Sequence, residues 1–153
     1  MEIERKFLIG NIPDLSEYKY HEIEQAYLNT NPVVRIRKED DTYYLTYKGK
    51  GFMAREEYNL PLNKESYEHL LKKADGNIIS KRRYLIPYDK YTIELDIFTG
   101  VFQGLVIAEV EFDSVDEANS FIGPDWFVED VTSDKKYHNS YLSKLDLNEM
   151  STE

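Results

Sequence analysis

The segment Tyr91-Thr-Ile-Glu-Leu-Asp-Ile-Phe98 alternates acidic and apolar side chains over a short, β-branched and aromatic run. Because successive side chains of a strand point to opposite faces, Glu94 and Asp96 share one face while aliphatic side chains fill the other. Such a strand separates a charged surface from an apolar one. The fold therefore depends on which of these two surfaces is covered.

The same alternation recurs along most of the chain. We predict eight strands, over Glu2–Ile9, His21–Leu28, Val33–Lys38, Thr42–Lys48, Ala54–Leu60, Ile78–Ile86, Tyr91–Phe98 and Val106–Asp113. Turn signals separate several of them, as in Gly49-Lys-Gly51 and in Pro87-Tyr-Asp-Lys90. Short strands that are mostly joined by such turns are typical of an antiparallel sheet.

Three helices are predicted in the remaining gaps. They cover Lys64–Lys73, a segment from Ser114 to about Phe121 that opens with a capping box, and Asp134–Leu145. Amphipathic helices need an apolar surface to cover, so we expect the apolar strand faces to lie outside, under the helices. The predicted fold is α+β, mainly β: a closed, eight-stranded antiparallel barrel with helices packed outside and charged faces inside.

The inward faces of this barrel carry a balanced set of charges. The bases are Lys6, Arg35, Arg37, Lys48, Arg55, Lys81 and Arg83, and the acids are Glu2, Glu4, Glu57, Glu94, Asp96, Glu109 and Glu111. Any one such face is more simply explained as a solvated outer surface, but the joint pattern favours an interior. Enclosed charges are costly unless they are paired or bind a metal or ligand. Carboxylates that hold Mg²⁺ or Mn²⁺, with bases that hold phosphate oxygens, meet this requirement.

The overall composition excludes several other functions. None of the 153 residues is Cys, and the three His lack metal-ligand spacing, so we expect neither a disulfide framework nor a zinc site. A net charge of −10 disfavours binding to a nucleic-acid duplex. No apolar run approaches the roughly 20 residues of a membrane span, and the first residues lack signal-peptide character. We therefore expect one cytoplasmic domain over residues 1–153, monomeric or homodimeric, with a short tail at about 146–153.

An ordered set of motifs points to a known family. The set comprises Glu2-Ile-Glu-Arg-Lys6, Gln25-Ala-Tyr-Leu28, Arg35-Ile-Arg37, Leu45-Thr-Tyr-Lys48, Arg55-Glu-Glu57, Lys81-Arg-Arg-Tyr84, Glu94-Leu-Asp-Ile-Phe98, Glu109-Val-Glu-Phe112 and Val131-Thr-Ser-Asp-Lys-Lys-Tyr-His-Asn139. With it the chain resembles the CYTH, or triphosphate tunnel metalloenzyme, superfamily, and within it the short bacterial branch. The resemblance implies a triphosphate-binding tunnel with a divalent metal, a C-terminal helix that plugs one mouth, and hydrolysis of tripolyphosphate to pyrophosphate and phosphate.

The acidic and basic residues receive different expected roles. Glu2, Glu4, Glu109 and Glu111 are expected to form one metal-binding cluster, because pairs on the first and last strands become neighbours when the barrel closes. Glu94 and Asp96 complete it, hold a second ion, or merely pair with nearby bases. The expected phosphate clamps are Arg35, Arg37, Lys48, Arg55, Lys81 and Arg83.

For three further residues the sequence leaves two possible roles open. Lys6 contacts phosphate, or it helps to deprotonate or orient the nucleophile if its pKa is lowered. Tyr27 is a proton acceptor or a packing side chain. Lys136, on the predicted plug helix, reaches the substrate or stays exposed. No role is assigned to His138, and Trp126 and Phe127 are interpreted as outer packing.

Rival functions remain open from the sequence alone. A class IV adenylyl cyclase would use the same metals and clamps but needs a purine pocket, and a thiamine triphosphatase needs an aromatic platform. A non-enzymatic polyphosphate or nucleotide sensor would keep the clamps without needing the metal-binding carboxylates. The presence of these carboxylates favours an enzyme that acts on a small triphosphate.

Overall fold

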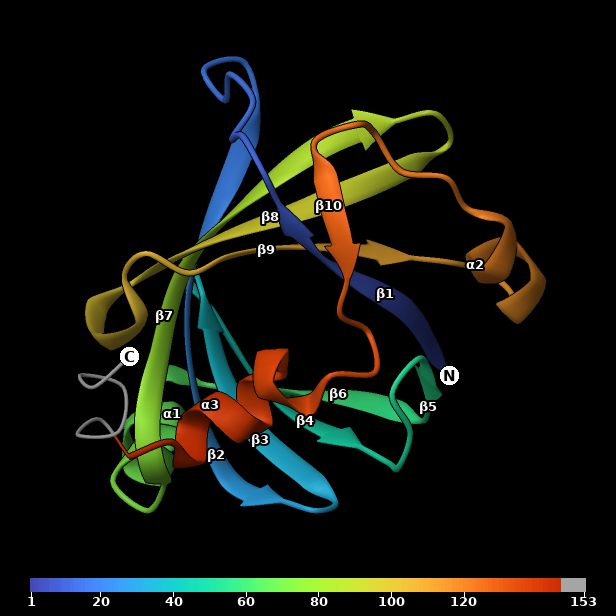
Figure 1. Ribbon diagram of the computed structural model, residues 1–153. Helices are drawn as coiled ribbons and strands as arrows, with labels where there is room; N and C mark the ends of the chain where they lie inside the picture. The colour runs from blue at the N-terminus through green and yellow to red at the C-terminus, as the bar shows by residue number, and fades with distance from the viewer. Residues whose placement is uncertain (147–153) are drawn as a thin grey trace.

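The computed structural model describes residues 1–146, whose strands wrap into a nearly closed antiparallel barrel (Figure 1). The strands are β1 (Glu2–Ile9), β2 (Lys19–Thr30), β3 (Val33–Glu39), β4 (Thr42–Lys48), β5 (Ala54–Arg55), β6 (Glu57–Leu62), β7 (Asp75–Tyr88), β8 (Tyr91–Thr99), β9 (Val106–Glu111) and β10 (Phe127–Asp130). The helices are α1 (Lys64–Leu71), α2 (Val115–Ser120), α3 (Asn139–Lys144) and the 3₁₀ turns η1 (Gly100–Phe102) and η2 (Lys135–Tyr137). The strands run in the order β10-β1-β9-β8-β7-β2-β3-β4-β6, with β5 on β1. The predicted fold class is confirmed.

Closure of the barrel depends on one interrupted strand. The predicted strand Ala54–Leu60 breaks at Glu56, so that β5 pairs with β1 while β6 pairs with β4. Arg55 lies opposite Glu2, and Glu57 lies opposite Lys48. The break therefore brings charged residues of β1, β4, β5 and β6 to the same seam.

Strand β10 was not predicted. It pairs with the end of β1, where Phe7 lies opposite Asp130. Phe127 stacks on Phe7 with ring centroids 4.5 Å apart, and Trp126 packs against the same apolar cluster. The expected outer packing of these two aromatics is confirmed. Phe127 is the first residue of β10, and Trp126 directly precedes it.

Apolar side chains cover the outer faces of the sheet, as expected. One outer cluster contains Phe7, Leu95 and Val110 and packs against Ala118 of α2. A second contains Ile36 and is covered by Tyr67 of α1. Full burial of such side chains contributes roughly 1.5–3 kcal/mol each, so the helices hold the charged faces inward.

The C-terminal helix closes one end of the barrel from inside. The predicted helix Asp134–Leu145 is divided into η2 and α3, and Leu142 packs against apolar side chains that continue the inward strand faces, among them Ile79, Phe98 and Ile107. Asn77 donates hydrogen bonds from Nδ2 to the carbonyls of Leu142 and Leu145, at 3.0 and 2.8 Å. The charged interior thus ends on an apolar plug.

A glycine at the start of β7 lets this helix approach closely. Gly76 has φ 75°, and a Cβ built there would lie 1.9 Å from the carbonyl oxygen of Ser143. Any larger residue would therefore displace α3. The predicted tail lies outside the described residues except for Asp146, and the single domain remains a prediction. Within residues 1–146 no helix is both long and apolar enough to cross a membrane.

Candidate active site inside the barrel

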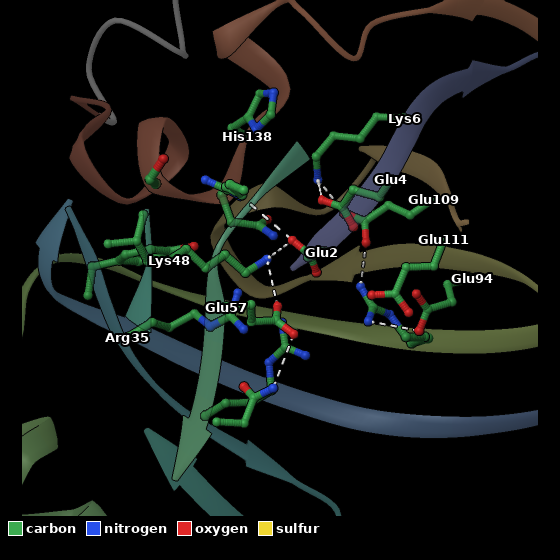
Figure 2. A pocket seen from close by; sticks show the side chains of 18 of the residues that line it. Glu2, Glu4, Lys6, Arg35, Lys48, Glu57, Glu94, Glu109, Glu111 and His138 are labelled. Atoms are coloured by element: carbon green, nitrogen blue, oxygen red, sulfur yellow. Dashed lines mark hydrogen bonds and ion pairs between the residues drawn. The ribbon is translucent and has the colours of Figure 1, made fainter. Parts of the chain in front are cut away.

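The barrel encloses a cavity of about 350 Å³ whose walls are mainly charged. Its lining residues are Glu2, Glu4, Lys6, Tyr27, Val33, Arg35, Arg37, Glu39, Tyr44, Lys48, Arg55, Glu57, Asn59, Arg83, Glu94, Glu109, Glu111, His138, Asn139 and Ser140. Acidic side chains extend from β1, β8 and β9, while Arg35 and Lys48 extend from the facing strands (Figure 2). Most of the predicted site residues therefore meet in one place.

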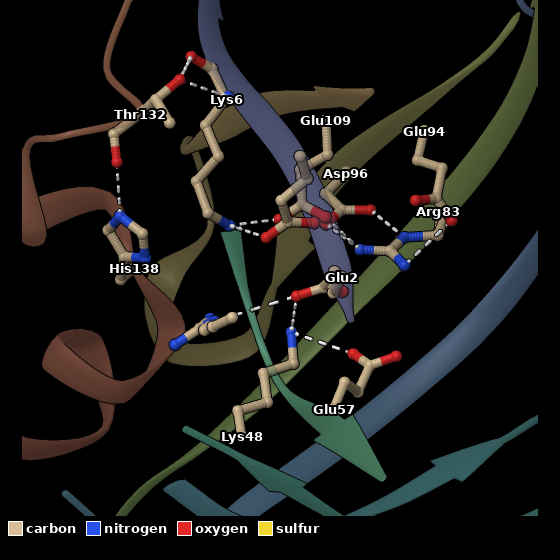
Figure 3. Close-up of polar contacts among 12 residues, drawn as sticks. Glu2, Lys6, Lys48, Glu57, Arg83, Glu94, Asp96, Glu109, Thr132 and His138 are labelled. Atoms are coloured by element: carbon tan, nitrogen blue, oxygen red, sulfur yellow. Dashed lines mark hydrogen bonds and ion pairs between the residues drawn. The ribbon is translucent and has the colours of Figure 1, made fainter. Parts of the chain in front are cut away.

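Arg83 is the centre of a paired network on the acidic side (Figure 3). Its Nε and Nη2 donate to the two carboxylate oxygens of Asp96 at 2.7 and 2.9 Å, and Nη1 and Nη2 donate to Glu94 and Glu109 at 3.1 and 2.9 Å. Burial alone would lower the pKa of Arg83, but these three carboxylates raise it well above its usual value. Each of these carboxylate oxygens therefore already accepts a hydrogen bond from Arg83.

Lys6 completes this network from β1. Its Nζ donates a short hydrogen bond to Glu109 and lies 4.0 Å from Glu4. Burial alone would lower the pKa of Lys6, but Glu109 and Glu4 together raise it above its usual value. Its ammonium is therefore protonated near neutral pH. The lowered pKa on which a role as proton acceptor depended is not found, whereas an orienting or phosphate-binding role is compatible with this geometry.

A group of three carboxylates lies at the seam where the barrel closes. One oxygen from each of Glu2, Glu57 and Glu111 falls within 4.8 Å of the others. Lys48 Nζ bridges two of them, at 2.8 Å from Glu2 and 3.4 Å from Glu57. Burial, followed by the charges of Glu2 and other nearby carboxylates, raises the pKa of Glu111 to about 7. Negative charge is therefore incompletely compensated here.

The membership of this cluster differs from the expected one. Glu109 is committed to Lys6 and Arg83, and Glu57 takes its place beside Glu2 and Glu111. Glu4 lies opposite Glu111 in the β1–β9 ladder. Carboxylate oxygens without nitrogen or sulfur ligands are the donor set that Mg²⁺ and Mn²⁺ prefer, so the residues fit a hard divalent cation.

The basic side of the cavity contains an arginine without a partner. Arg35 is only 5% exposed, yet its side chain makes no hydrogen bond or ion pair with any residue in the described part of the chain. Next to it on the same face, Arg37 donates to Gln25 Oε1 at 2.8 Å and to the Tyr44 hydroxyl at 3.4 Å. Burial, and then the charges of Arg35 and Arg83, lower the pKa of Arg37. Positive charge is in excess here, because Glu39, whose Oε1 lies 3.7 Å from Arg37 Nη1, is the only carboxylate of the described residues that pairs with either arginine.

Three of the predicted site residues do not line the cavity. Lys81 and Asp96 are almost fully buried and pair with each other, with Lys81 Nζ 2.7 Å from Asp96 Oδ2. Burial lowers the pKa of Lys81 to about 7. Lys136 is exposed and lies 3.8 Å from Asp134. Each is directed toward another residue of the chain, and their contacts with phosphate or metal stay predictions. Tyr27 lines the cavity but also packs in the apolar cluster of the plug.

Several lining residues were not among the predicted site residues. Tyr44 and Asn59 share strand faces with Lys48 and Glu57, and Glu39 stands two positions from Arg37, so the alternation identifies all three as inward. His138 lies in a turn and has no such signal. Its Nε2 donates to the Thr132 carbonyl at 2.8 Å, and burial followed by the charge of Lys6 lowers the pKa of its imidazole.

Known proteins place the chain in a family. The CYTH domain family model matches residues 1–146. An inorganic triphosphatase of Nitrosomonas europaea is 39% identical over 147 residues, which cover 93% of this chain and 96% of that protein. Another, of Acetivibrio thermocellus, is 38% identical over 150 residues, covering 94% and 93%. A crystal structure of an inorganic triphosphatase has a TM-score of 0.71 at 35% identity and covers 95% of this chain and 96% of that one. The chain belongs to the CYTH domain family.

Proposed function

We propose that this chain is a divalent-metal-dependent inorganic triphosphatase that hydrolyses tripolyphosphate to pyrophosphate and phosphate. The observation that carries the proposal is Arg35, a buried guanidinium without a partner that faces a cavity rich in carboxylates. A buried arginine is costly unless an anion neutralises it, and its planar fork suits two phosphate oxygens. The names of the relatives from Nitrosomonas europaea and Acetivibrio thermocellus support the same activity.

The two sides of the cavity divide the work. Arg35 and Arg37 bind successive phosphate groups, and Gln25 and Tyr44 hold the guanidinium plane of Arg37. Glu2, Glu57 and Glu111 hold the cation, Mg²⁺ or Mn²⁺. When bound, that cation supplies positive charge that offsets the negative charge of the phosphate oxygens.

Positioning and charge account for the chemical step. A water oxygen attacks the terminal phosphorus, the bridging P–O bond breaks, and pyrophosphate leaves with the bridging oxygen. Little covalent chemistry falls to the protein in such a transfer. Lys6, held protonated by Glu109, orients the water or a phosphate oxygen by donating a hydrogen bond. The expected cytoplasmic location rests on the sequence alone.

The shape of the cavity favours a small inorganic substrate over a nucleotide. Val33 is its single aliphatic lining residue in the described part of the chain, and the apolar plug closes one end. A purine needs an apolar or aromatic surface of its own size, and Tyr27 and Tyr44 are the aromatic side chains in this lining. The adenylyl cyclase alternative has no further observation in its favour.

One panel of assays tests the proposal. Release of phosphate and pyrophosphate is measured from tripolyphosphate, ATP and thiamine triphosphate, with Mg²⁺, with Mn²⁺ and with excess chelator. We expect tripolyphosphate to give the highest kcat/KM and the chelator to abolish turnover. Formation of cyclic AMP, preference for a nucleotide, or full turnover in chelator would each refute it.

A further inference from the structure

A second cavity adjoins the tunnel beside α3. Its volume is about 550 Å³, and it lies among the β2–β3 turn, the loop of residues 49–52 and the segment of residues 135–144. It shares four lining residues with the candidate active site: Val33, Arg55, His138 and Ser140. The two spaces therefore adjoin, with Arg55 at the boundary.

The charged residues of this second cavity are all basic. They are Lys50, Arg55, Lys135 and Lys144, and no Asp or Glu from the described part of the chain lines it. We call Lys50, Lys135 and Lys144 the basic entrance. These three lysines are exposed, and none forms an ion pair with another described residue. Their charge is therefore available to an incoming anion.

Local structure holds the basic entrance in place. Gly51 has φ 126°, and a Cβ built there would lie 2.4 Å from the carbonyl oxygen of Ala54, so the loop turns sharply just after Lys50. The neighbouring Phe52 packs its ring on His138, with centroids 5.6 Å apart. This contact ties the loop to the segment that carries Lys135 and Lys144.

The surroundings make this patch unusual for the chain. The net charge is −10, so a polyanion is repelled by most of the surface. A different cavity, at the start of β8, shares Glu94 and Glu111 with the tunnel and also includes Asp113. Its single lysine, Lys90, is paired with Glu117 at 2.5 Å. The tunnel therefore adjoins an acidic cavity at the start of β8 and a basic one at the basic entrance.

We propose that the basic entrance captures a linear phosphoanhydride anion and passes it through Arg55 into the tunnel, and this inference rests on the proposed function. A focused field of one sign raises association rates by about 10- to 1,000-fold and weakens steeply with salt. The three lysines do not line the candidate active site, so they act on association and not on the chemical step.

Charge reversal at the entrance tests the proposal. In K50E/K135E/K144E we expect kcat/KM for tripolyphosphate at low ionic strength to fall about tenfold or more, while kcat changes less than about twofold. At about 1 M salt, where the Debye length is about 3 Å, the difference from wild type should largely vanish. The neutral variant K50Q/K135Q/K144Q should show a smaller decrease in kcat/KM at low ionic strength. It replaces the charge-reversed variant in this test if charge reversal prevents folding.

A matched variant controls for global charge. Lys38, Lys72 and Lys73 are exposed and line neither cavity, so K38E/K72E/K73E changes the net charge equally but leaves the entrance intact. If the entrance variants match this control at low ionic strength, or if their loss lies in kcat and persists in high salt, the inference is wrong.

A binding measurement separates this inference from the proposed function. Tripolyphosphate is titrated calorimetrically into each protein in chelator, where turnover is not expected. Weaker binding by the entrance variants than by the control, beside normal wild-type turnover, supports both ideas. Normal wild-type turnover with equal binding by all variants overturns the entrance alone. A wild-type protein that neither binds nor hydrolyses tripolyphosphate overturns both.

Discussion

The two sides of the cavity treat buried charge in opposite ways. Around β8 and β9, Arg83 contacts three carboxylates, and one of them, Glu109, also contacts Lys6. On β3, Arg35 is just as buried and contacts none. Burial of a charge without a partner costs several kcal/mol, so a chain keeps such a group only where something outside it offsets the cost. The paired charges around Arg83 form the wall, whereas the unpaired Arg35 indicates where an anionic ligand binds.

The largest expected effect is the loss of Arg83. In Arg83→Met the carboxylate of Asp96 loses its main counter-charge, and that of Glu109 keeps only Lys6 as a direct partner, while both remain buried. Breaking a buried pair in this way costs about 3–5 kcal/mol, so the free energy of unfolding should fall by that amount in urea denaturation. The matched variant Arg35→Met leaves no carboxylate unpaired and should be as stable as wild type or more so. Equal destabilisation by both substitutions would remove the distinction between the two sides.

The sequence predicted where charges would gather, and one of its interpretations, that Glu94 and Asp96 pair with Lys81 or Arg83, matches the structure, but it did not predict the pairing of Glu109. Strand alternation identified Glu109 and Arg83 as inward residues, and both line the cavity. It could not show that they neutralise one another, because they lie on β7 and β9, on either side of β8, and alternation does not predict contacts across an intervening strand. The same limit explains why Glu57 was not assigned to the carboxylate cluster: its position beside Glu2 follows from the break between β5 and β6.

Local signals fixed most elements, and non-local ones were missed. The predicted bounds of β1 and β4 match the structure, and the Ser114 side chain accepts from the Glu117 backbone N–H as the capping box requires. Strand β10 has four residues and exists because it pairs with the end of β1, which no local pattern announces. His138 was missed for a related reason, since the groups around it include Phe52 and Lys6, which lie far away in the chain.

The second effect concerns turnover. Glu111→Gln should reduce kcat for tripolyphosphate by roughly 100-fold or more, the size expected when a strong electrostatic contribution to the transition state is lost. Glu2→Gln, in the same carboxylate cluster, should behave similarly. Steady-state kinetics over a range of Mg²⁺ and Mn²⁺ concentrations measure this. Wild-type kcat in both variants would mean that the metal ligands lie elsewhere.

The third effect separates binding from catalysis at Arg35. In Arg35→Met the affinity for tripolyphosphate should fall about 10- to 100-fold, because a charge-assisted hydrogen bond contributes about 1.5–3 kcal/mol. Metal affinity of the substrate-free protein should stay nearly unchanged, which calorimetric titration checks. Arg35→Lys retains the charge without the fork and should recover part of the loss. Unaltered affinity in Arg35→Met would leave the unpartnered guanidinium without an explanation.

The fourth effect is a pH dependence that arises at the carboxylate cluster. In the metal-free protein, burial and then the charges of Glu2 and other nearby carboxylates raise the pKa of Glu111 to about 7, so the folded state holds its proton where the unfolded state has lost it. Stability from this group is therefore full below its usual pKa of about 4.5 and is lost as pH rises toward 7. Because Glu111 is partly exposed, we expect a change on the order of 1 kcal/mol.

The difference between wild type and Glu111→Gln isolates this contribution. Other titrating groups cancel in the difference, so the variant should gain relative stability between about pH 5 and pH 7.5 in chemical denaturation. Saturating Mg²⁺ should reverse the gain, since it stabilises wild type. A difference that does not vary with pH would show that the cluster carries no uncompensated charge.

The smallest effect concerns His138, which is linked to β1 through Thr132. Its Nε2 donates to the Thr132 carbonyl, and the Thr132 hydroxyl accepts from the Lys6 backbone N–H at 3.0 Å. His138→Phe keeps a ring against Phe52 but loses the hydrogen bond, at a cost of about 1 kcal/mol. Burial and the charge of Lys6 lower the pKa of His138, so wild type also loses stability as pH falls below the ordinary value of 6.5. The deficit of the variant should therefore be larger at pH 7 than at pH 5. The pH–rate profile tests the role more sharply. If the imidazole only positions Thr132 and Lys6, the profile of His138→Phe should have the same shape as that of wild type. If one ionisation disappears from the profile of the variant, His138 is the proton acceptor that the strand pattern could not reveal.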